Sequence, residues 1–323
     1  MRKTAFFLTA AYAIWAASPT QAVAQQWPDK PVRILIPFPP GGGTDIQGRL
    51  LASAFQKSMG QNFIVDNRTG ASGLIATQLA VDSPPDGNTI LFTSGSLSVI
   101  VTLYARRMKF NVYNDLAPVS WISSTPLVLS LHPSVPAKSV KELVALARRT
   151  PGGMNAAGNA AGSTAHLTAE MLNQFAGAKS TVLTYRGGGP AVLALISGEA
   201  DYLFATAPSI MPHLRTGKAR ALAVTTPKRS SALPELPTMN SIYPGFESDN
   251  WYAMFYPKGT ARPIVDKLNA EIRKALDTPE VKAFMPHEAL DPVASSPEEL
   301  AALLKREIPK YAKVIELANI RLD

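Results

Sequence analysis

Short apolar runs alternate with amphipathic segments along almost the whole chain. Apolar runs bounded by Gly, Pro or Asn predict strands, and apolar positions three and four residues apart predict helices. The predicted strands cover residues 32–36, 62–67, 89–92, 127–131, 154–157, 181–185, 202–205, 219–225 and 250–256. The predicted helices cover residues 46–59, 74–81, 140–149, 163–175, 190–197, 263–276 and 297–317. This alternation predicts an α/β fold with mostly parallel sheets.

Local signals mark several helix starts. Ser139 and Glu142 are three residues apart and form a capping-box pattern. Thr44 or Asp45 is expected to cap the helix that follows the first glycine-rich loop. Ser163 and Thr164 are expected either to cap the helix that they precede or to donate hydrogen bonds to a carboxylate. Pro208 fits the first turn of a further helix, where a missing N–H is tolerated.

The chain length of 323 residues is enough for two ordinary domains. Polar extended segments near residues 123–125 and 247–250 are interpreted as paired crossovers between two lobes. We therefore expect a first lobe of residues 25–124 and 250–323, with residues 125–249 inserted as the second. Ligands of open α/β sheets bind beyond the carboxyl ends of the strands, so a site is expected in the cleft between the lobes.

The first 24 residues have the pattern of a secretory signal peptide. Arg2 and Lys3 precede an apolar stretch over residues 5–17, and Ala22-Val23-Ala24 fits a cleavage site. The apolar stretch is too short to span a membrane. We expect export to the periplasm with cleavage near Ala24.

Composition excludes several classes of function. The chain has no cysteine, which rules out thiol catalysis and thiolate metal sites. Its net charge is +8, but the basic residues are scattered without interleaved aromatics, which argues against nucleic acid and favours acidic small molecules. The sequence contains no nucleophile elbow, phosphate-binding loop or zinc-binding histidine pair. We therefore predict no catalytic residue, no metal and no cofactor.

The most informative segment is the loop Pro37-Phe38-Pro39-Pro40-Gly41-Gly42-Gly43-Thr44-Asp45, between a predicted strand and a predicted helix. A helix start presents unpaired N–H groups and attracts anions, and glycines let a ligand approach the backbone. The alternative is a turn that only connects two elements. Residues 158–164 and 185–190 repeat the combination of small residues and a helix start.

The candidate ligand-binding residues lie in these three loops and in two more, residues 93–96 and 205–209, which follow predicted strands. His166 either faces the cleft or holds a loop, and Arg186 either pairs with a carboxylate or is a solvated surface charge. The candidates are Phe38, Gly41, Gly42, Gly43, Thr44, Asp45, Thr93, Ser94, Ser96, Gly162, Ser163, Thr164, His166, Tyr185, Arg186, Gly187, Gly188 and Thr206.

The mature chain resembles the extracytoplasmic solute receptors of tripartite tricarboxylate transporters, the Bug group. The similarity covers residues 27–323. It is carried by Trp27-Pro28-Asp29-Lys30-Pro31, residues 37–45, Val65-Asp66-Asn67-Arg68, Pro85-Asp86-Gly87, residues 135–143, residues 185–190, Leu222-Ala223-Val224-Thr225 and Leu236-Pro237-Thr238.

The resemblance implies a two-lobed Venus-flytrap receptor of the type II class that closes over a small organic acid and docks on permease subunits. In similar proteins the loops matching 41–45 and 185–190 hold the ligand carboxylate, and those matching 162–166 and 93–96 complete the pocket. Such receptors often carry Asp-Asn where this chain has Ala205-Thr206. That departure suggests a ligand without an amine or extra hydroxyls, such as a simple dicarboxylate or an aromatic one like terephthalate.

Other interpretations stay open at this point. A monomeric binding protein is favoured, with aromatic walls expected from Phe38, Tyr185, Phe204 or Trp251, although such residues more often pack in cores. The alternatives are a ligand sensor for a signalling system, a receptor for amino acids or phosphate, and a carboxylate-processing hydrolase.

Overall fold

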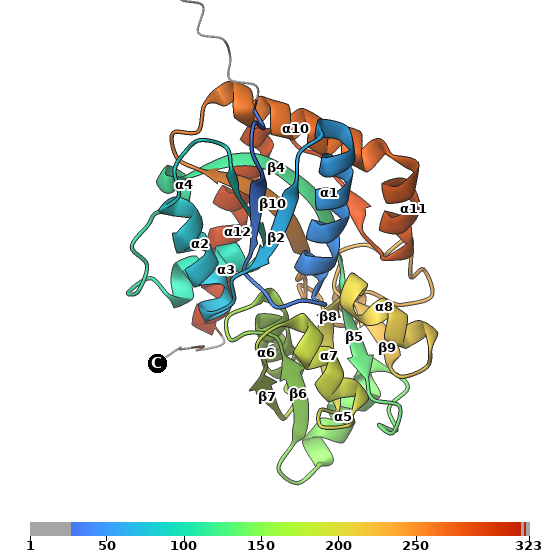
Figure 1. The fold of residues 1–323 in the computed structure, drawn as a ribbon. Coiled ribbons are helices and arrows are strands. Elements are labelled where there is room, and N and C mark those ends of the chain that lie inside the picture. The colour runs from blue at the N-terminus through green and yellow to red at the C-terminus, as the bar shows by residue number, and fades with distance from the viewer. Residues whose placement is uncertain (1–26, 318–319, 321–323) are drawn as a thin grey trace, which may run out of the picture.

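The computed structural model describes residues 27–317 and residue 320, which form two lobes around two separate sheets (Figure 1). The strand order is β11-β4-β10-β3-β1-β2 in the first sheet and β7-β6-β8-β5-β9 in the second. The first sheet contains β1 (Val32–Ile36), β2 (Phe63–Asn67), β3 (Thr89–Ser94), β4 (Leu116–Thr125), β10 (Asn250–Pro257) and β11 (Asp291–Pro292). The second contains β5 (Leu127–Leu131), β6 (Met154–Gly158), β7 (Ser180–Thr184), β8 (Tyr202–Thr206) and β9 (Arg220–Val224).

Helices cover both faces of the first sheet because its strands are apolar on both sides. One face packs against α1 (Gly43–Met59), α10 (Arg262–Asp277) and α11 (Pro279–His287). The other face packs against α2 (Leu74–Val81), α3 (Ser96–Leu103) and α12 (Pro297–Leu317), with η1 (Ala71–Gly73) and α4 (Val112–Asp115) as short connections.

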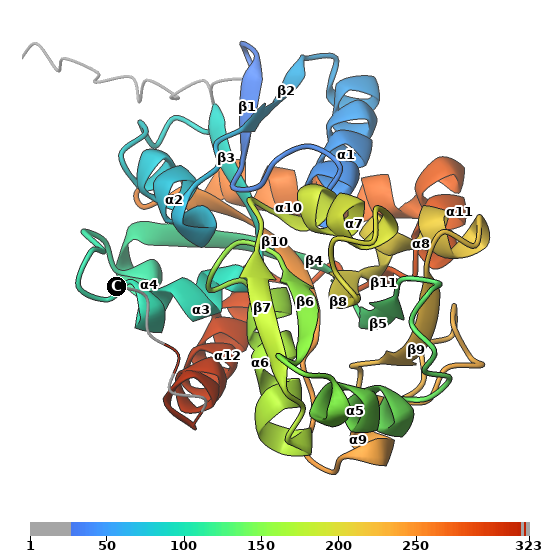
Figure 2. The same cartoon turned by 90° about the horizontal axis from the view of Figure 1, so that it is seen from below.

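The second sheet is also covered on both faces. The first face packs against α5 (Val140–Arg149), α6 (Thr164–Ala176) and α9 (Met239–Ile242), and the second against α7 (Gly188–Ile196) and α8 (Ala207–Arg215). Helix α8 is in contact with α1 of the first lobe, and Figure 2 shows α7 and α8 on the side of the second sheet that faces α1. The lobes therefore touch in this conformation.

The prediction of mostly parallel sheets is wrong. Parallel pairs join β1 to β2 and β3, and β6 to β7 and β8. All other pairs are antiparallel: β10 with β3 and β4, β11 with β4, and β5 with β8 and β9. The alternation of strands and helices does not reveal the direction of each strand. β4 carries the chain out of the first lobe and β10 carries it back, so these two strands run in opposite directions.

The chain crosses between the lobes twice, and one threonine joins the two crossings. Residues 123–125 end β4 instead of forming a free linker, and Thr125 lies opposite Asn250 on β10. The buried Thr225 accepts a hydrogen bond from the Leu127 N–H (3.0 Å) and donates one to the Ser248 carbonyl (2.6 Å). We propose that the lobes divide as the sequence predicts, at residues 124–125 and 249–250.

The structure confirms one of the predicted helix caps and contradicts another. Ser139 caps α5 by accepting from the Glu142 N–H, as predicted, but the Glu142 carboxylate accepts from the N–H of Lys138. Thr44 and Asp45 do not cap α1, because the helix begins at Gly43 and Gly42 occupies the capping position. A glycine there leaves the first N–H groups of α1 open.

Candidate functional site

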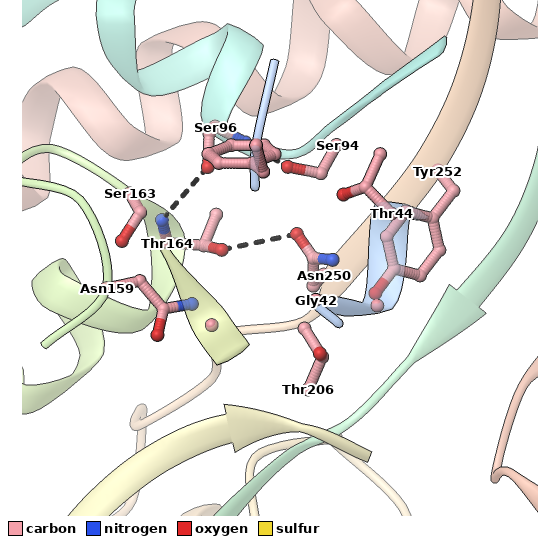
Figure 3. A pocket seen from close by; sticks show the side chains of 13 residues that line it. Gly42, Thr44, Ser94, Ser96, Asn159, Ser163, Thr164, Thr206, Asn250 and Tyr252 are labelled. Atoms are coloured by element: carbon pink, nitrogen blue, oxygen red, sulfur yellow. Dashed lines mark hydrogen bonds between the residues drawn. The ribbon is translucent and has the colours of Figure 1, made fainter. Parts of the chain in front are cut away.

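A small cavity lies between the lobes, beyond the carboxyl ends of strands from both sheets. Its volume is about 30 Å³, room for about two water molecules. Figure 3 shows the polar side chains that face it from both lobes. The lining residues are Phe38, Gly42, Gly43, Thr44, Ser94, Ser96, Asn159, Ser163, Thr164, Gly188, Thr206, Asn250 and Tyr252.

Five helices begin at this cavity. Helices α1 and α3 present their first residues, Gly43 and Ser96, from the first lobe. Helices α6 and α7 present Thr164 and Gly188 from the second lobe, and α8 presents its capping residue Thr206. The first N–H groups of a helix lack intrahelical partners, and each helix start carries a partial positive charge. The arrangement therefore favours an anion.

None of the described residues that line the cavity has a charged side chain. Their polar groups are hydroxyls, such as those of Thr44, Ser94 and Ser163, and the amides of Asn159 and Asn250. Without a cationic partner, an anion here would be held by hydrogen bonds and helix dipoles. This avoids the desolvation that a buried ion pair requires.

Asp45 lies beside the cavity but is turned away from it. Its carboxylate accepts hydrogen bonds from Arg49 Nε (3.0 Å), Asn67 Nδ2 (3.0 Å) and the Gly41 N–H (3.1 Å). Burial alone would raise the pKa of Asp45, but the hydrogen bonds from Arg49 and Asn67 outweigh it and hold the pKa below its ordinary value. Asp45 therefore fixes the shape of the loop, and Arg49 neutralises its charge.

Asn250 joins the two lobes at the cavity wall. Its Oδ1 accepts from the Gly95 N–H of the first lobe and from Thr164 Oγ1 of the second, each at 3.2 Å. The Thr164 N–H also donates to Ser96 Oγ at 3.4 Å, and the two Thr164 bonds are dashed in Figure 3. The two bonds of Thr164 exist only while the lobes are together, so they stabilise the closed form.

Tyr252 closes the other side of the cavity. Its hydroxyl is buried near Thr206 and Asn250, yet it makes no well-formed hydrogen bond with the described residues. A methyl group on Gly43 would stand 2.1 Å from this hydroxyl and 2.7 Å from Thr206 Oγ1. Only glycine fits at position 43, because the start of α1 lies directly against both side chains.

Ten of the predicted ligand-binding residues line the cavity: Phe38, Gly42, Gly43, Thr44, Ser94, Ser96, Ser163, Thr164, Gly188 and Thr206. They come from separate loops, and closure brings them together. Whether each contacts a ligand stays a prediction.

The other eight predicted residues do not line it. Thr93 faces the opposite side of β3 from Ser94, as the alternation of a strand requires. Gly41 donates its N–H to Asp45 and is not part of the wall. Gly187 packs on Pro39, which would lie 2.6 Å from an added methyl carbon. Tyr185 and Arg186 line a second, separate cavity.

The contacts of His166 favour the structural role over ligand binding. Its Nδ1 accepts a hydrogen bond from the Gly162 N–H at 3.1 Å, so both residues shape the loop before α6. Ser163 caps this helix by accepting from the His166 N–H at 3.2 Å, as predicted. Burial lowers the pKa of His166 to about 4, so the ring is neutral at physiological pH.

Three lining residues were missed from the sequence: Asn159, Asn250 and Tyr252. Asn159 lies in a loop that the sequence marks as a site, but Asn250 and Tyr252 belong to a strand that looks like buried core. Conversely, two of the aromatic residues suggested as walls are core residues. Phe204 stacks on Phe246 and Trp251 packs against α3 and α12.

The buried His166 and the half-buried Asp249 should change the free energy of unfolding in opposite directions with pH. The lowered pKa of His166 means that stability is lost as pH falls from 6.5 towards 4, by up to about 3 kcal/mol. Burial raises the pKa of Asp249 to about 7, so its contribution is lost as pH rises from 3.8 through 7. Between pH 8 and pH 5, His166→Gln should therefore lose less stability than the wild type, and Asp249→Asn should lose more.

Thermal unfolding of the three proteins at pH 5 and pH 8 measures this difference. Asn173→Gln serves as a control substitution on α6, because position 173 carries no titrating group. Shifts of the same sign in the His166 and Asp249 variants would contradict the assignment.

Within the described part of the chain, no group of three or more His, Asp or Glu side chains is placed to hold a metal ion. No helix there combines the length and hydrophobicity that crossing a membrane requires.

Comparison with known proteins agrees with this geometry. Residues 48–320 match the model of the tripartite tricarboxylate transporter family receptor. Protein BugT of Bordetella pertussis is 36% identical over 301 residues, which are 93% of this chain and 92% of BugT.

Two similar solved structures come from Rhodopseudomonas palustris. Rpa4515 with adipate has a TM-score of 0.88 and 32% identity, covering 91% of this chain and 99% of its own. MatC with bound malate has a TM-score of 0.84 and 28% identity, covering 90% and 100%. The fold is thus the two-lobed one of periplasmic binding proteins, and the chain belongs to the tripartite tricarboxylate transporter receptor family.

Proposed function

We propose that this receptor is exported to the periplasm, encloses a small organic carboxylate between its lobes and presents it to membrane permease subunits. As a member of its family, the protein is a solute-binding receptor and not an enzyme. Residues 1–24, the predicted signal peptide, lie outside the described residues. The finer assignments concern the ligand, the site residues and the partner.

The convergence of five helix starts on one neutral cavity carries the proposal. Each helix start stabilises a nearby anion by about 0.3–1 kcal/mol, and more where the site is partly buried. Hydrogen bonds from hydroxyl and N–H groups to a charged oxygen contribute about 1.5–3 kcal/mol each. Micromolar affinity corresponds to about 8 kcal/mol, so several of these contacts must act together to capture the ligand.

The side chains that line the cavity limit the kinds of ligand that it can bind. The structural neighbours carry adipate and malate, which are both carboxylates. The described lining residues of this cavity offer no carboxylate to an ammonium group. Ala205 is buried in the core of the second lobe, and only Thr206 of that pair reaches the wall. We therefore favour carboxylates without an amine, including dicarboxylates and aromatic acids such as terephthalate.

A thermal-shift screen followed by calorimetry tests the function. The screen covers aliphatic and aromatic mono- and dicarboxylates, amino acids and inorganic phosphate. Stabilisation by carboxylates alone supports the proposal, whereas stabilisation by amino acids or phosphate alone would overturn it. Formation of product from a bound acid would favour the hydrolase instead.

The variant Gly188→Val tests whether the ligand binds in this cavity. A Cβ at position 188 would lie 3.6 Å from Asn159 Nδ2 and 3.7 Å from the Gly42 Cα, so the additional methyl groups of valine would obstruct closure. Overpacking typically costs 1–3 kcal/mol, and we expect a loss of affinity of roughly tenfold or more by calorimetry. Leu193→Ala, at an exposed position of the same helix, is the matched control. Equal affinities of Gly188→Val and the control would place the site elsewhere.

A further inference from the structure

Asp249 carries a half-buried carboxyl group in the second crossover between the lobes. The residue before it, Ser248, is held by the second lobe: its hydroxyl lies 2.5 Å from that of Thr168 on α6, and its carbonyl accepts from Thr225 at 2.6 Å. The residue after it, Asn250, begins β10 of the first sheet. Asp249 therefore stands where the backbone passes from one lobe to the other. Short segments of this kind absorb the changes of φ and ψ when domains open and close.

A helix that contacts both lobes covers this crossover. Helix α12 contacts α3 of the first lobe and α6 of the second (Figure 2). The hydroxyl of Tyr311 on α12 donates to the Asp249 carbonyl at 3.1 Å. The Tyr311 ring is fully buried in a cluster with Val99 on α3 and Leu167 on α6. Separation of the lobes pulls this cluster apart and lets water reach the crossover, so the solvation of Asp249 depends on whether the lobes are together.

The groups around Asp249 favour its neutral form. Its Oδ1 is buried without a hydrogen-bond partner among the described residues. Three carboxylates repel a negative charge there: Glu307 on α12, Glu247 in the crossover segment and Asp291 on β11. Lys310 on α12 attracts such a charge, but its Nζ lies 3.7 Å from Glu307 Oε2 and is shared with it. Burial, the largest cause, and the three carboxylates outweigh Lys310 and raise the pKa of Asp249 from 3.8 to about 7.

We propose that Asp249 is a hinge residue whose protonation favours closure: the closed receptor holds its carboxyl group neutral, and opening lets the group ionise. In the open form water reaches the carboxyl group and its pKa falls towards the ordinary value. Because the pKa is higher in the closed form than in the open one, closure over a ligand takes up a proton near neutral pH. Ligand affinity therefore rises as pH falls through 7 and is lowest above it.

Calorimetry with adipate, malate and the tightest-binding compound of the thermal-shift screen tests the inference, in pairs of buffers that differ in ionisation enthalpy. The variant Asp249→Asn keeps the shape of the neutral acid and shows which protons the ligand and the histidines exchange. Relative to this variant, the wild type should take up nearly one proton per ligand at pH 6 and about a tenth of one at pH 8. On the same comparison, its affinity should be about tenfold higher at pH 6 than at pH 8.

Two further variants distinguish a proton-linked role from a merely structural one. Lys310→Met removes the cation that lowers the pKa of Asp249, so the midpoint of proton uptake should move to higher pH. Glu247→Gln removes a repelling carboxylate, so the midpoint should move to lower pH. Lys305→Met, at an exposed position of α12, is the matched control and should keep the wild-type midpoint. A structural role of Asp249 alone would change the affinity without moving this midpoint.

The inference rests on the proposed function only because it requires the lobes to close over a ligand, whatever the class of that ligand. Equal proton uptake by the wild type and Asp249→Asn, or unmoved midpoints in the Lys310 and Glu247 variants, would overturn the inference. If carboxylates bind in that case, the proposed function stands. If only amino acids or phosphate bind, and Asp249 takes up the proton, the inference stands and the proposed function fails. If no compound of the screen binds, both fail.

Discussion

Asn250→Asp should nearly abolish carboxylate binding at neutral pH and leave the fold in place. The two side chains have the same shape, so one oxygen can still accept from the Gly95 N–H and from Thr164 Oγ1. The second oxygen replaces the amide nitrogen in the cavity wall (Figure 3), where the described lining residues include no cationic side chain. Two like charges about 4 Å apart repel by roughly 4 kcal/mol at a protein surface, which corresponds to roughly a thousandfold in affinity.

Calorimetry at pH 7.5 and pH 5.5 measures this loss. Burial beside an anion raises the pKa of a carboxyl group, so protonation of the new aspartate should restore part of the affinity at the lower pH. Asn114→Asp adds the same charge at an exposed position on α4 and should bind like the wild type. Wild-type affinity of Asn250→Asp at pH 7.5 would refute the idea that a neutral wall is required.

Gly43→Ala should have the second largest effect. The added methyl group would lie 2.1 Å from the Tyr252 hydroxyl in its own lobe and 2.7 Å from Thr206 Oγ1 in the other. The first clash strains the first lobe and lowers Tm, whereas the second prevents closure. Overpacking of this kind costs 1–3 kcal/mol or more, so we expect roughly a hundredfold loss of affinity.

A double variant separates the two clashes. Tyr252→Phe removes the hydroxyl, so Gly43→Ala/Tyr252→Phe should regain most of the lost Tm but little of the affinity, since Thr206 remains. Thermal unfolding and calorimetry on the same preparations provide both values. If Gly43→Ala alone closed and bound the ligand normally, α1 would not pack against the second lobe as described.

Features that depend on neighbouring residues could be predicted from the sequence. Ser139 and Ser163 cap their helices as expected, because capping is decided within three residues. The glycine-rich loops were also located correctly, since a strand followed by glycines and a helix start is a local pattern. Most strand and helix boundaries agree within two residues for the same reason.

Features set by distant packing could not be predicted. The strand β4 was missed because Pro118 and several serines interrupt its apolar pattern. Two of these serines are buried with partners from other elements: Ser120 donates to the Ser295 carbonyl, and Ser123 accepts from Gln47. Tyr252 was missed as a site residue because a tyrosine in an apolar strand has the signature of the core. Its place at the cavity follows from how β10 pairs with β3 and β4.

Asp45 lies in a predicted site loop but does not line the cavity. Its position in the glycine-rich loop favoured a role in ligand binding or capping, and only the contacts with Arg49 and Asn67 reveal that it fixes the loop from behind. Such partners are set by the tertiary fold and leave no mark in the local sequence.

A crystal structure with the tightest acid from the ligand screen is the most direct test of a carboxylate site built from helix starts. The account predicts one carboxylate in the small cavity, accepting hydrogen bonds from N–H groups at the starts of α1 and α7 and from hydroxyls of both lobes. A carboxylate held by an ion pair elsewhere, with the small cavity filled only by water, would contradict it.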